Sequence, residues 1–319
     1  MPLSIDDYAD SLDQRDLIWP QVPAPRPVKA RPSIDPIPEI RAVLWDVYGT
    51  ILRIPDPGFS LFPEPEVRLQ VALDKTIHEF SMWNSMYRQP GPPWQSMIKQ
   101  YRDYASRLEQ VACKYAHDMT DINLVSVWGG IINRLHDKEY SWETATYGDD
   151  DQLAEKVALF FHRCLQAMEA RPNIVSVLNN LHSQGIRMGL FSNGQSFTRA
   201  EVRNLLRRQA EIPEMEQLFP SEQSLLSFQM GIKKPSPTLY RQIAGQFLSR
   251  GIEPEQILHV STRVETDLAE ARAVGMRTAL LAEEKSGLEA STNLLKDPQT
   301  RPDRLLTKIT QIISVVGFN

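Results

Sequence analysis

The fold is decided by the stretch Arg41-Ala-Val-Leu-Trp-Asp46-Val-Tyr48-Gly-Thr50-Ile-Leu52, in which an apolar run ends abruptly in a carboxylate, a glycine and a hydroxyl. A short apolar run with such boundaries is typical of a buried strand in a parallel sheet. Ligand sites of open α/β sheets lie at the carboxyl ends of these strands, so the stretch predicts that Asp46 is a positioned nucleophile. An alternative interpretation is an Asx turn in which Asp46 only caps the loop, and this stretch alone does not choose between the two.

The composition excludes several classes of function. Hydrophobic residues make up 42% of the 319 residues, enough for a sizeable core, and the length predicts two domains. The formal net charge is -5, so there is no basic surplus for nucleic acid or an anionic membrane. No run of roughly 18 apolar residues is present, and the start Met1-Pro-Leu-Ser-Ile lacks the basic and apolar regions of a signal peptide. We therefore expect a cytoplasmic protein with a small-molecule substrate; the oligomeric state is not indicated.

The cysteines and histidines do not indicate a metal centre. Cys113 and Cys164 both lie in helix-like apolar patterns, so we expect packed thiols rather than a disulfide or a metal pair. The six histidines show no spacing typical of metal ligands.

Prolines are concentrated at the start of the chain. Eight of the 23 prolines precede Glu39, which disfavours both regular strand pairing and a continuous helix. We predict that residues 1–38 form an extended arm. The arm would wrap the domain through Ile18 and Trp19, dock on another chain, or remain a partly ordered tail, which is the commoner outcome for such a composition.

Residues 54–169 are predicted to form a helical cap. From about residue 65 onward the pattern is helical, with helices expected to begin near residues 66, 93, 121 and 151, and runs typical of strands are absent. Tryptophans of this segment would line a substrate pocket or, as is more usual in a small helical domain, form its own core. They are Trp83, Trp94, Trp128 and Trp142.

After residue 172 the pattern alternates between helices and short strands. Helices are predicted over 174–182, from 198, over 237–248 and over 266–274, and strands over 186–191, 257–261 and 277–281. This alternation is typical of a doubly wound, Rossmann-like parallel sheet of the α/β class. The first strand belongs to the same sheet, so residues 39–53 and 170–319 are predicted to form one core with the helical cap inserted between them.

Polar residues also follow the later strands. Residues 188–191 lead into Ser192 and Asn193, whose hydroxyl and amide would hold anionic oxygens, although alone this is an ordinary strand-to-helix turn. In Lys234-Pro235 the proline opens a helix and disfavours helical geometry at Lys234. An ammonium group at this position would neutralise developing negative charge, whereas the alternative is a solvated surface lysine.

The last of these strands is followed by a hydroxyl and an acid. Residues 257–260 lead into Ser261, and Asp267 comes shortly afterwards. Asp267 would accept a hydrogen bond from Lys234 and orient it, or would simply lie in the first turn of a helix, where carboxylates are favourable. We expect Asp267 and the polar groups after the other strands to line one cleft.

Together these segments resemble the haloacid dehalogenase superfamily. Its pattern is a nucleophilic Asp after the first strand, Ser or Thr after the second, a Lys before Pro, and an acidic fourth segment. The matching positions are Asp46, Ser192, Lys234 and Asp267, in the same order and with a helical insertion after the first motif. The resemblance implies an α/β core with a helical cap and a hydrolase that uses an aspartate nucleophile.

The chain departs from the phosphatases of this superfamily. Those resemble Asp-x-Asp-Gly-Thr in the first motif, where the second Asp protonates the leaving alkoxide, but Tyr48 stands there. A phenol with a reference pKa near 10 is a poor substitute for that acid. Their fourth motif resembles Gly-Asp, with the Asp on Mg²⁺, whereas here it is Ser261-Thr262. No cofactor is therefore favoured, although Asp46 with Asp267, and with Glu265 as a further ligand, would offer Mg²⁺ a weak site.

The same positions are similar to the 2-haloacid dehalogenase branch, in which Asp-x-Tyr-Gly-Thr and Val-Ser-Ser replace the phosphatase forms. Displacing halide from carbon needs a carboxylate nucleophile but neither a proton for the leaving group nor a metal. Tyr240, six residues after Lys234, also fits the Lys-Pro-x-x-x-x-Tyr spacing of the branch. Arg263 departs from it, because the branch has Asn there, and the arginine that binds the substrate carboxylate is not identified. The candidates are Arg53, Arg88 and Arg102.

The resemblance implies a role for each matching residue. Asp46 would attack carbon and form an ester, Lys234 would neutralise Asp46 and the substrate carboxylate, and Asp267 would hold Lys234 or help water hydrolyse the ester. Residues implied to bind or orient the reacting groups are Tyr48, Thr50, Ser192, Asn193, Tyr240 and Ser261.

Three hypotheses about function follow. The first is a metal-independent, dehalogenase-like hydrolase acting on a small carboxylate-bearing substrate. The second is a Mg²⁺-dependent phosphatase that tolerates Tyr48. The third is a catalytically silent relative that binds a partner through the cap and the proline-rich arm.

Overall fold

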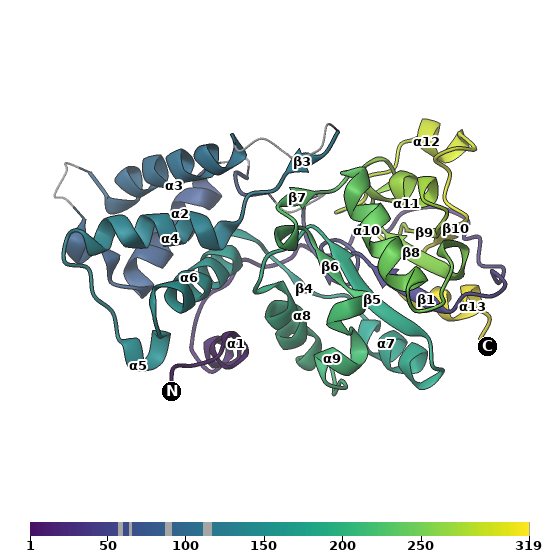
Figure 1. Cartoon of the computed structure of the whole chain (residues 1–319), viewed down its shortest axis with the longest axis horizontal. Coiled ribbons are helices and arrows are strands. Elements are labelled where there is room, and N and C mark those ends of the chain that lie inside the picture. Colours follow the sequence, from purple (N-terminus) through teal and green to yellow (C-terminus); the bar gives the residue numbers. More distant parts are fainter. Residues whose placement is uncertain (57–59, 64–65, 87–90, 111–116, 319) are drawn as a thin grey trace.

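The protein consists of a sheet with helices on both faces and a separate group of helices beside it (Figure 1). The computed structural model describes residues 1–56, 60–63, 66–86, 91–110 and 117–318. Arg88 and Cys113 lie outside the described residues. Within the described ranges, none of the helices is both long and apolar enough to cross a membrane.

The central sheet has strands in the order β10-β9-β8-β1-β5-β6, and the paired neighbours run parallel. Val43 lies opposite Met188 on one side and Leu258 on the other, so the three predicted strands share one sheet, as expected. The strands are β1 (Ala42–Trp45), β5 (Arg187–Ser192), β6 (Leu225–Leu226), β8 (Ile257–Ser261), β9 (Arg277–Leu281) and β10 (Arg304–Leu306).

Both faces of the sheet are buried, because successive side chains of a strand point to opposite faces. Val43 and Trp45 pack in one hydrophobic cluster, and Ala42 and Leu44 in another. The first cluster includes α7 (Ile174–Ser183), α8 (Thr198–Arg207), α9 (Met215–Leu218) and α13 (Ile312–Val315), and the second includes α10 (Pro237–Leu248) and α11 (Ala269–Ala273). The remaining helix of this part, α12 (Thr292–Lys296), lies near the end of the chain. The predicted doubly wound α/β class is confirmed.

The helical insertion, residues 54–169, has a hydrophobic cluster that is separate from the sheet. Its helices are α2 (Val67–Glu79), α3 (Pro93–Glu109), α4 (Leu124–His136), α5 (Thr144–Tyr147) and α6 (Asp150–Leu165), and the expected helix starts are confirmed to within a few residues. Strand β2 (Leu52–Arg53) pairs antiparallel with β4 (Glu169–Ala170), which brings the two ends of the insertion together. The division into domains at these residues stays a prediction.

The insertion also contacts the core through a short strand pair that the sequence did not indicate. Strand β3 (Met119–Thr120) pairs antiparallel with β7 (Ile232–Lys233), directly before Lys234. The described residues also contain short helical turns, at Met82–Ser85, Ser221–Gln223, Ser227–Gln229, Pro254–Gln256, Val264–Leu268 and Ile309–Gln311. The turn Val264–Leu268 is π-helical and precedes α11, so the single helix predicted over 266–274 is divided in two.

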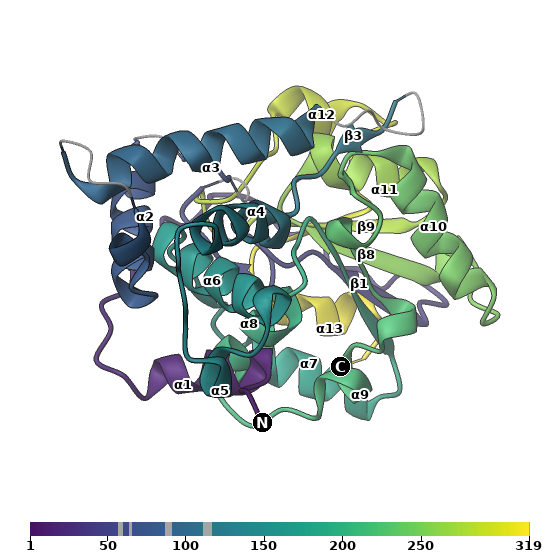
Figure 2. The same ribbon diagram turned by 60° about the vertical axis from the view of Figure 1, so that its left-hand side comes forward.

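The prediction of an extended arm over residues 1–38 is wrong for its first part, which contains helix α1 (Ile5–Asp13). Ser4 caps this helix by accepting a hydrogen bond from the backbone of Asp7, and one apolar face is buried against α6 and α8 (Figure 2). Seven of the eight prolines before Glu39 follow α1, so they do not interrupt this helix. Beyond α1 the chain crosses the core, where Ser33 forms a bridge with Leu305.

Candidate active site

Asp46 lies at the carboxyl end of β1 and is fully buried. Its Oδ1 atom is 2.9 Å from Ser192 Oγ and 3.4 Å from Lys234 Nζ. Its backbone N–H donates to the carbonyl of Val260 in β8, so the loop after β1 is held against the neighbouring strand. Side chains that follow three different parts of the core therefore converge on one carboxylate, as the parallel sheet predicts.

Lys234 bridges the two carboxylates of the site. Its Nζ atom is 2.8 Å from Asp267 Oδ1, donates to the carbonyl of Phe191 at 2.7 Å, and lies 4.2 Å from the centre of the Phe191 ring. The backbone N–H of Lys234 donates to Asn193 Oδ1 at 2.7 Å. Lys234 is only 4% exposed, so the alternative of a solvated surface lysine is wrong.

Asp267 is an anion held between cations in the π-helical turn Val264–Leu268. Its Oδ1 atom is 2.7 Å from His259 Nε2, while His259 Nδ1 lies 3.2 Å from the carbonyl of Leu44. The two ring nitrogens of His259 therefore lie between two hydrogen-bond acceptors, a carbonyl and a carboxylate. Burial raises the pKa of Asp267, but the charges of His259 and Lys234 outweigh burial and hold that pKa well below its usual range.

Arg263 provides a cation that the sequence analysis treated only as a departure from the dehalogenase branch. Its guanidinium donates to Asp46 Oδ2 at 2.6 Å and to the carbonyl of Tyr48 at 2.9 Å. The residue is 8% exposed. Its segment is fixed because the backbone N–H of Val264 donates to the carbonyl of Glu289. The only sequence signal was a charged residue two positions after Ser261.

Tyr48, which stands where phosphatases have their acid, turns its hydroxyl toward α8. The hydroxyl donates to Glu201 Oε2 at 2.9 Å and lies 3.1 Å from Thr198 Oγ1. Glu201 Oε1 is in turn 2.9 Å from His162 Nδ1 of α6. Burial and the charge of Glu201 raise the pKa of Tyr48 well above its usual value, so the phenol stays protonated. No motif or spacing in the sequence indicated Glu201 or His162.

The remaining candidate residues support the charged groups. Thr50 Oγ1 is 3.5 Å from Asp46 Oδ2, so Thr50 and Ser192 are the predicted hydroxyl residues that reach the nucleophile. Tyr240 donates to Asp267 Oδ1 at 3.0 Å. Ser261 Oγ accepts from the backbone N–H of Arg263, as Asn193 does from that of Lys234. Asn193, Tyr240 and Ser261 therefore hold Lys234, Asp267 and Arg263 in position.

The expected arginine or tryptophan from the cap does not contact Asp46 among the residues described. Trp128 packs against Tyr101 and Phe161 inside the insertion. Arg53 is paired with Glu284 and Glu169, and Arg102 with Glu66. The guanidinium beside Asp46 therefore comes from the core, through Arg263, and not from these positions.

The carboxylates that the sequence offers to Mg²⁺ are poorly arranged for it. Mg²⁺ usually takes one or two carboxylates together with several waters. Lys234 already contacts one oxygen of both Asp46 and Asp267, and Arg263 contacts the other oxygen of Asp46. Glu265 is exposed, and among the described contacts none joins it to Asp46. Since side-chain cations hold both oxygens of Asp46 and one oxygen of Asp267, this pair of carboxylates as arranged is a poor fit for a magnesium ion.

Comparison with known families decides the assignment. The family model of haloacid dehalogenase-like hydrolases matches residues 40–275, which is more than half of the chain. The chain belongs to this family. The match includes β1, β5 and β8, the strands whose ends meet at the site, and it confirms the resemblance seen in the motifs. A comparison with curated proteins found no match.

Solved structures of this hydrolase family are similar to the chain. The 2-haloacid dehalogenase from Pseudomonas syringae pv. Tomato DC3000 has a TM-score of 0.53 and 18% identity, with 86% of this chain and 96% of that chain covered. A dehalogenase with an intermediate complex has a TM-score of 0.47 and 14% identity, covering 89% and 100%. A predicted phosphoglycolate phosphatase from Haemophilus somnus 129pt has a TM-score of 0.42 and 14% identity, covering 86% and 97%. The first of these comparisons establishes the fold alone.

Proposed function

We propose that this haloacid dehalogenase-like hydrolase attacks carbon with Asp46, without a metal, and acts on a small carboxylate-bearing substrate of the 2-haloacid class. The observation that carries the proposal is the pair of cations, Lys234 and Arg263, on the two oxygens of the Asp46 carboxylate. They orient the carboxylate, and they offer positive charge to the carboxylate of an incoming substrate.

The reaction has two steps. Asp46 forms a carbon–oxygen bond to the substrate while the carbon–halogen bond breaks, and the halide leaves with the bonding electron pair. Water then attacks the carbonyl carbon of the Asp46 ester, which releases the hydroxy acid and a proton and restores the carboxylate. Since the pKa of Asp267 is held well below its usual range, Asp267 is better suited to orient Lys234 than to act as a base.

Two features favour this chemistry over phosphoryl transfer. A phosphate monoester needs a proton for its leaving alkoxide, but the Tyr48 hydroxyl donates to Glu201 and its pKa is raised. A phosphatase of this superfamily also needs carboxylates that hold Mg²⁺, and Lys234 and Arg263 occupy the oxygens of Asp46. Neither obstacle affects the displacement of halide.

A substrate screen tests the proposal. Purified protein is incubated with 2-chloropropionate or with p-nitrophenyl phosphate, each with Mg²⁺ and with EDTA. We expect chloride release that EDTA does not reduce, and no phosphate release. Phosphatase activity that requires Mg²⁺ would replace the proposal with phosphoryl transfer. A protein inert towards both substrates would favour the catalytically silent alternative.

Heavy-oxygen water distinguishes the mechanism within the first outcome. Hydrolysis of an ester at Asp46 places oxygen from water in the carboxyl group, so over multiple turnovers the label should appear in the peptide that contains Asp46. Direct attack of water on the substrate would leave that peptide unlabelled. The Asp46→Asn variant keeps the side-chain shape but removes the anionic nucleophile, so it should release no chloride above background and incorporate no label.

A further inference from the structure

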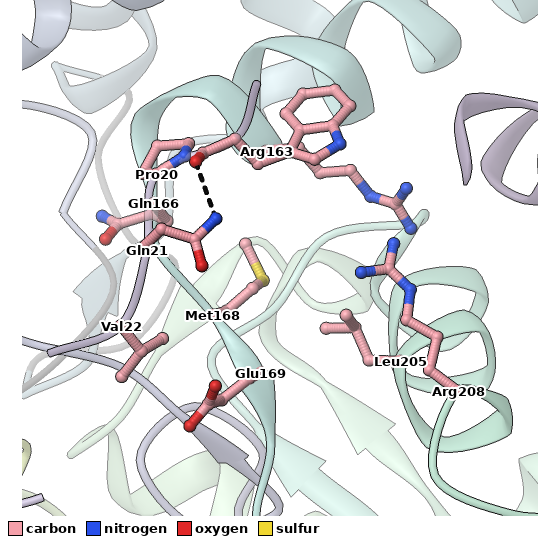
Figure 3. Close-up of a pocket in the computed structure, with 10 residues that line it drawn as sticks. Pro20, Gln21, Val22, Arg163, Gln166, Met168, Glu169, Leu205 and Arg208 are labelled. Carbon is pink, nitrogen blue, oxygen red and sulfur yellow. Dashed lines mark hydrogen bonds between the residues drawn. The ribbon is translucent and has the colours of Figure 1, made fainter. Parts of the chain in front are cut away.

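A second cavity lies away from Asp46, where the N-terminal segment crosses the junction of the insertion and the core. Its volume is about 190 Å³. It is enclosed by residues 19–22, the end of α6, the start of β4 and the end of α8 (Figure 3). The residues that contact the Asp46 side chain in the described structure are absent from its lining. The cavity is therefore separate from the candidate active site.

Two guanidinium groups meet at one end of this cavity. Arg163 comes from α6 and Arg208 from the end of α8, and Figure 3 shows their ends turned toward each other. Asp13 of α1 contacts both, at 3.6 Å from Arg163 Nη1 and 3.0 Å from Arg208 Nε. One carboxylate thus serves two positive charges at this end. Glu169 also lines the cavity, but it is paired with Arg53.

The hydrogen bonds of the buried Arg163 guanidinium go to neutral groups, while Asp13 contacts it as an ion pair. Arg163 is only 6% exposed and donates to the carbonyl of Ala9 and to Asn204 Oδ1. Burial lowers the pKa of Arg163 and outweighs the opposing charges of Glu201 and Asp13, and the like charge of Arg208 acts in the same direction as burial. An anion placed between the two guanidinium groups would offset both effects.

The rest of the lining mixes polar and apolar side chains, and the apolar ones offer a surface for a ring. Trp19, Val22, Met168 and Leu205 contribute hydrophobic surface. The Trp19 ring is fixed against Phe160 in an edge-to-face contact with centroids 5.5 Å apart. A dry apolar cavity of about 150 Å³ binds benzene in another protein, so about 190 Å³ accommodates one ring with a carboxylate but not a nucleotide.

We propose that this cavity is a binding site for a small organic anion, whose carboxylate contacts Arg163 and Arg208 and whose apolar body lies against Trp19 and Leu205. The site exists only when the N-terminal segment is docked, because residues 19–22 form one of its walls. The proposal is independent of the function proposed for Asp46.

Benzoate is the probe for the test, and isothermal titration calorimetry of the full chain is the measurement. We expect binding with a Kd of about 1 mM. Raising the salt concentration should weaken binding, and benzamide, which has the same shape without the charge, should bind about 10-fold more weakly or worse. No heat up to about 10 mM benzoate, or equal affinity for benzamide, would overturn the proposal.

Two neighbouring arginines provide matched variants. Arg208→Gln removes a guanidinium of the site, and Arg207→Gln removes one that pairs with Glu214 outside the lining. Both side chains are more than a third exposed, so both variants should fold. We expect Arg208→Gln to weaken benzoate binding about 10-fold and Arg207→Gln to leave it unchanged. Equal affinities of the two variants would place benzoate elsewhere, for example beside Arg263, and would refute this site.

Discussion

At the scale of single residues, the charges around Asp46 are arranged so that each buried ion has a partner. A buried carboxylate is costly unless it is paired and hydrogen-bonded. Asp46 has Lys234 and Arg263, and Asp267 has Lys234 and His259. Removing any one member weakens the compensation of the charges that remain buried, so substitutions here are expected to affect stability as well as activity.

Substitutions of Arg263 can test whether its charge or only its hydrogen bond to Asp46 matters for activity. Arg263→Gln should lower kcat for chloride release by about 100-fold, because Asp46 Oδ2 loses a charged hydrogen bond, and Arg263→Lys should restore only part of it. The measurement is kcat and KM separately, with circular dichroism to check the fold. Wild-type kcat in Arg263→Gln would show that Lys234 alone holds the nucleophile.

Asp267 makes stability depend on pH. Its folded-state pKa lies below the unfolded value near 3.9, so its contribution is complete above that pH and is lost as the pH falls toward the folded value. Asp267→Asn should lower the free energy of unfolding by about 3 kcal/mol at pH 7. Urea unfolding of both proteins should show this difference shrinking below about pH 4. A difference that does not change with pH would mean that Asp267 is protonated in the folded protein.

At the scale of elements, β5 depends on a glycine where the chain before β6 passes close by. A Cβ at Gly189 would lie 1.8 Å from the backbone oxygen of Gln223, which cannot move as a flexible side chain would. Gly189→Ala should therefore lower the free energy of unfolding by about 3 kcal/mol. Gly245→Ala in α10 is the control, because nothing lies within 4 Å and alanine favours a helix by about 1 kcal/mol. If urea unfolding gave the same change in the free energy of unfolding for both variants, β5 and the segment before β6 would not lie this close together.

Helix α1 is expected to be an integral part of the fold. Leu12 is fully buried in the hydrophobic cluster of the insertion. Leu12→Ala should cost about 3 kcal/mol in the free energy of unfolding, whereas Ile18→Ala, at a side chain that is 82% exposed, should change it by less than about 0.5 kcal/mol. Thermal and urea unfolding measure both. If Leu12→Ala lowered the free energy of unfolding no more than Ile18→Ala does, α1 would not be docked in solution.

At the scale of the whole molecule, a buried hydrogen bond joins the insertion to the core beside the candidate active site. His162 of α6 contacts Glu201 of α8, which also accepts from Tyr48. Phe197, at the start of α8, packs within the cluster of the insertion. The insertion is therefore attached to the core at the same place where the first motif is held.

Glu201→Gln tests this attachment, since it keeps the side-chain shape but removes the charge that His162 faces. We expect the free energy of unfolding to fall by about 3 kcal/mol and hydrogen exchange in α6 to become faster. Glu214→Gln, on a side chain that is 73% exposed, should change neither quantity. Unchanged exchange in α6 of Glu201→Gln would mean that the insertion is held by its apolar contacts alone.

The sequence by itself determined the α/β core, the helical insertion and the convergence of Asp46, Ser192, Lys234 and Asp267. Each of these follows from a local pattern, because apolar strands that end in polar residues must meet at one edge of a parallel sheet. Helix α1 had a local signal as well, in its capping Ser4 and its apolar spacing, but the prolines after it obscured that signal.

Only the tertiary structure decided which charges are paired. Arg263 lies 217 residues from Asp46, and His162 lies 39 residues from Glu201, so no spacing along the chain relates them. Partners of buried ions are selected by the packing that excludes water, and packing depends on the whole fold. For the same reason the second cavity, which three distant segments enclose, has no signature in the sequence.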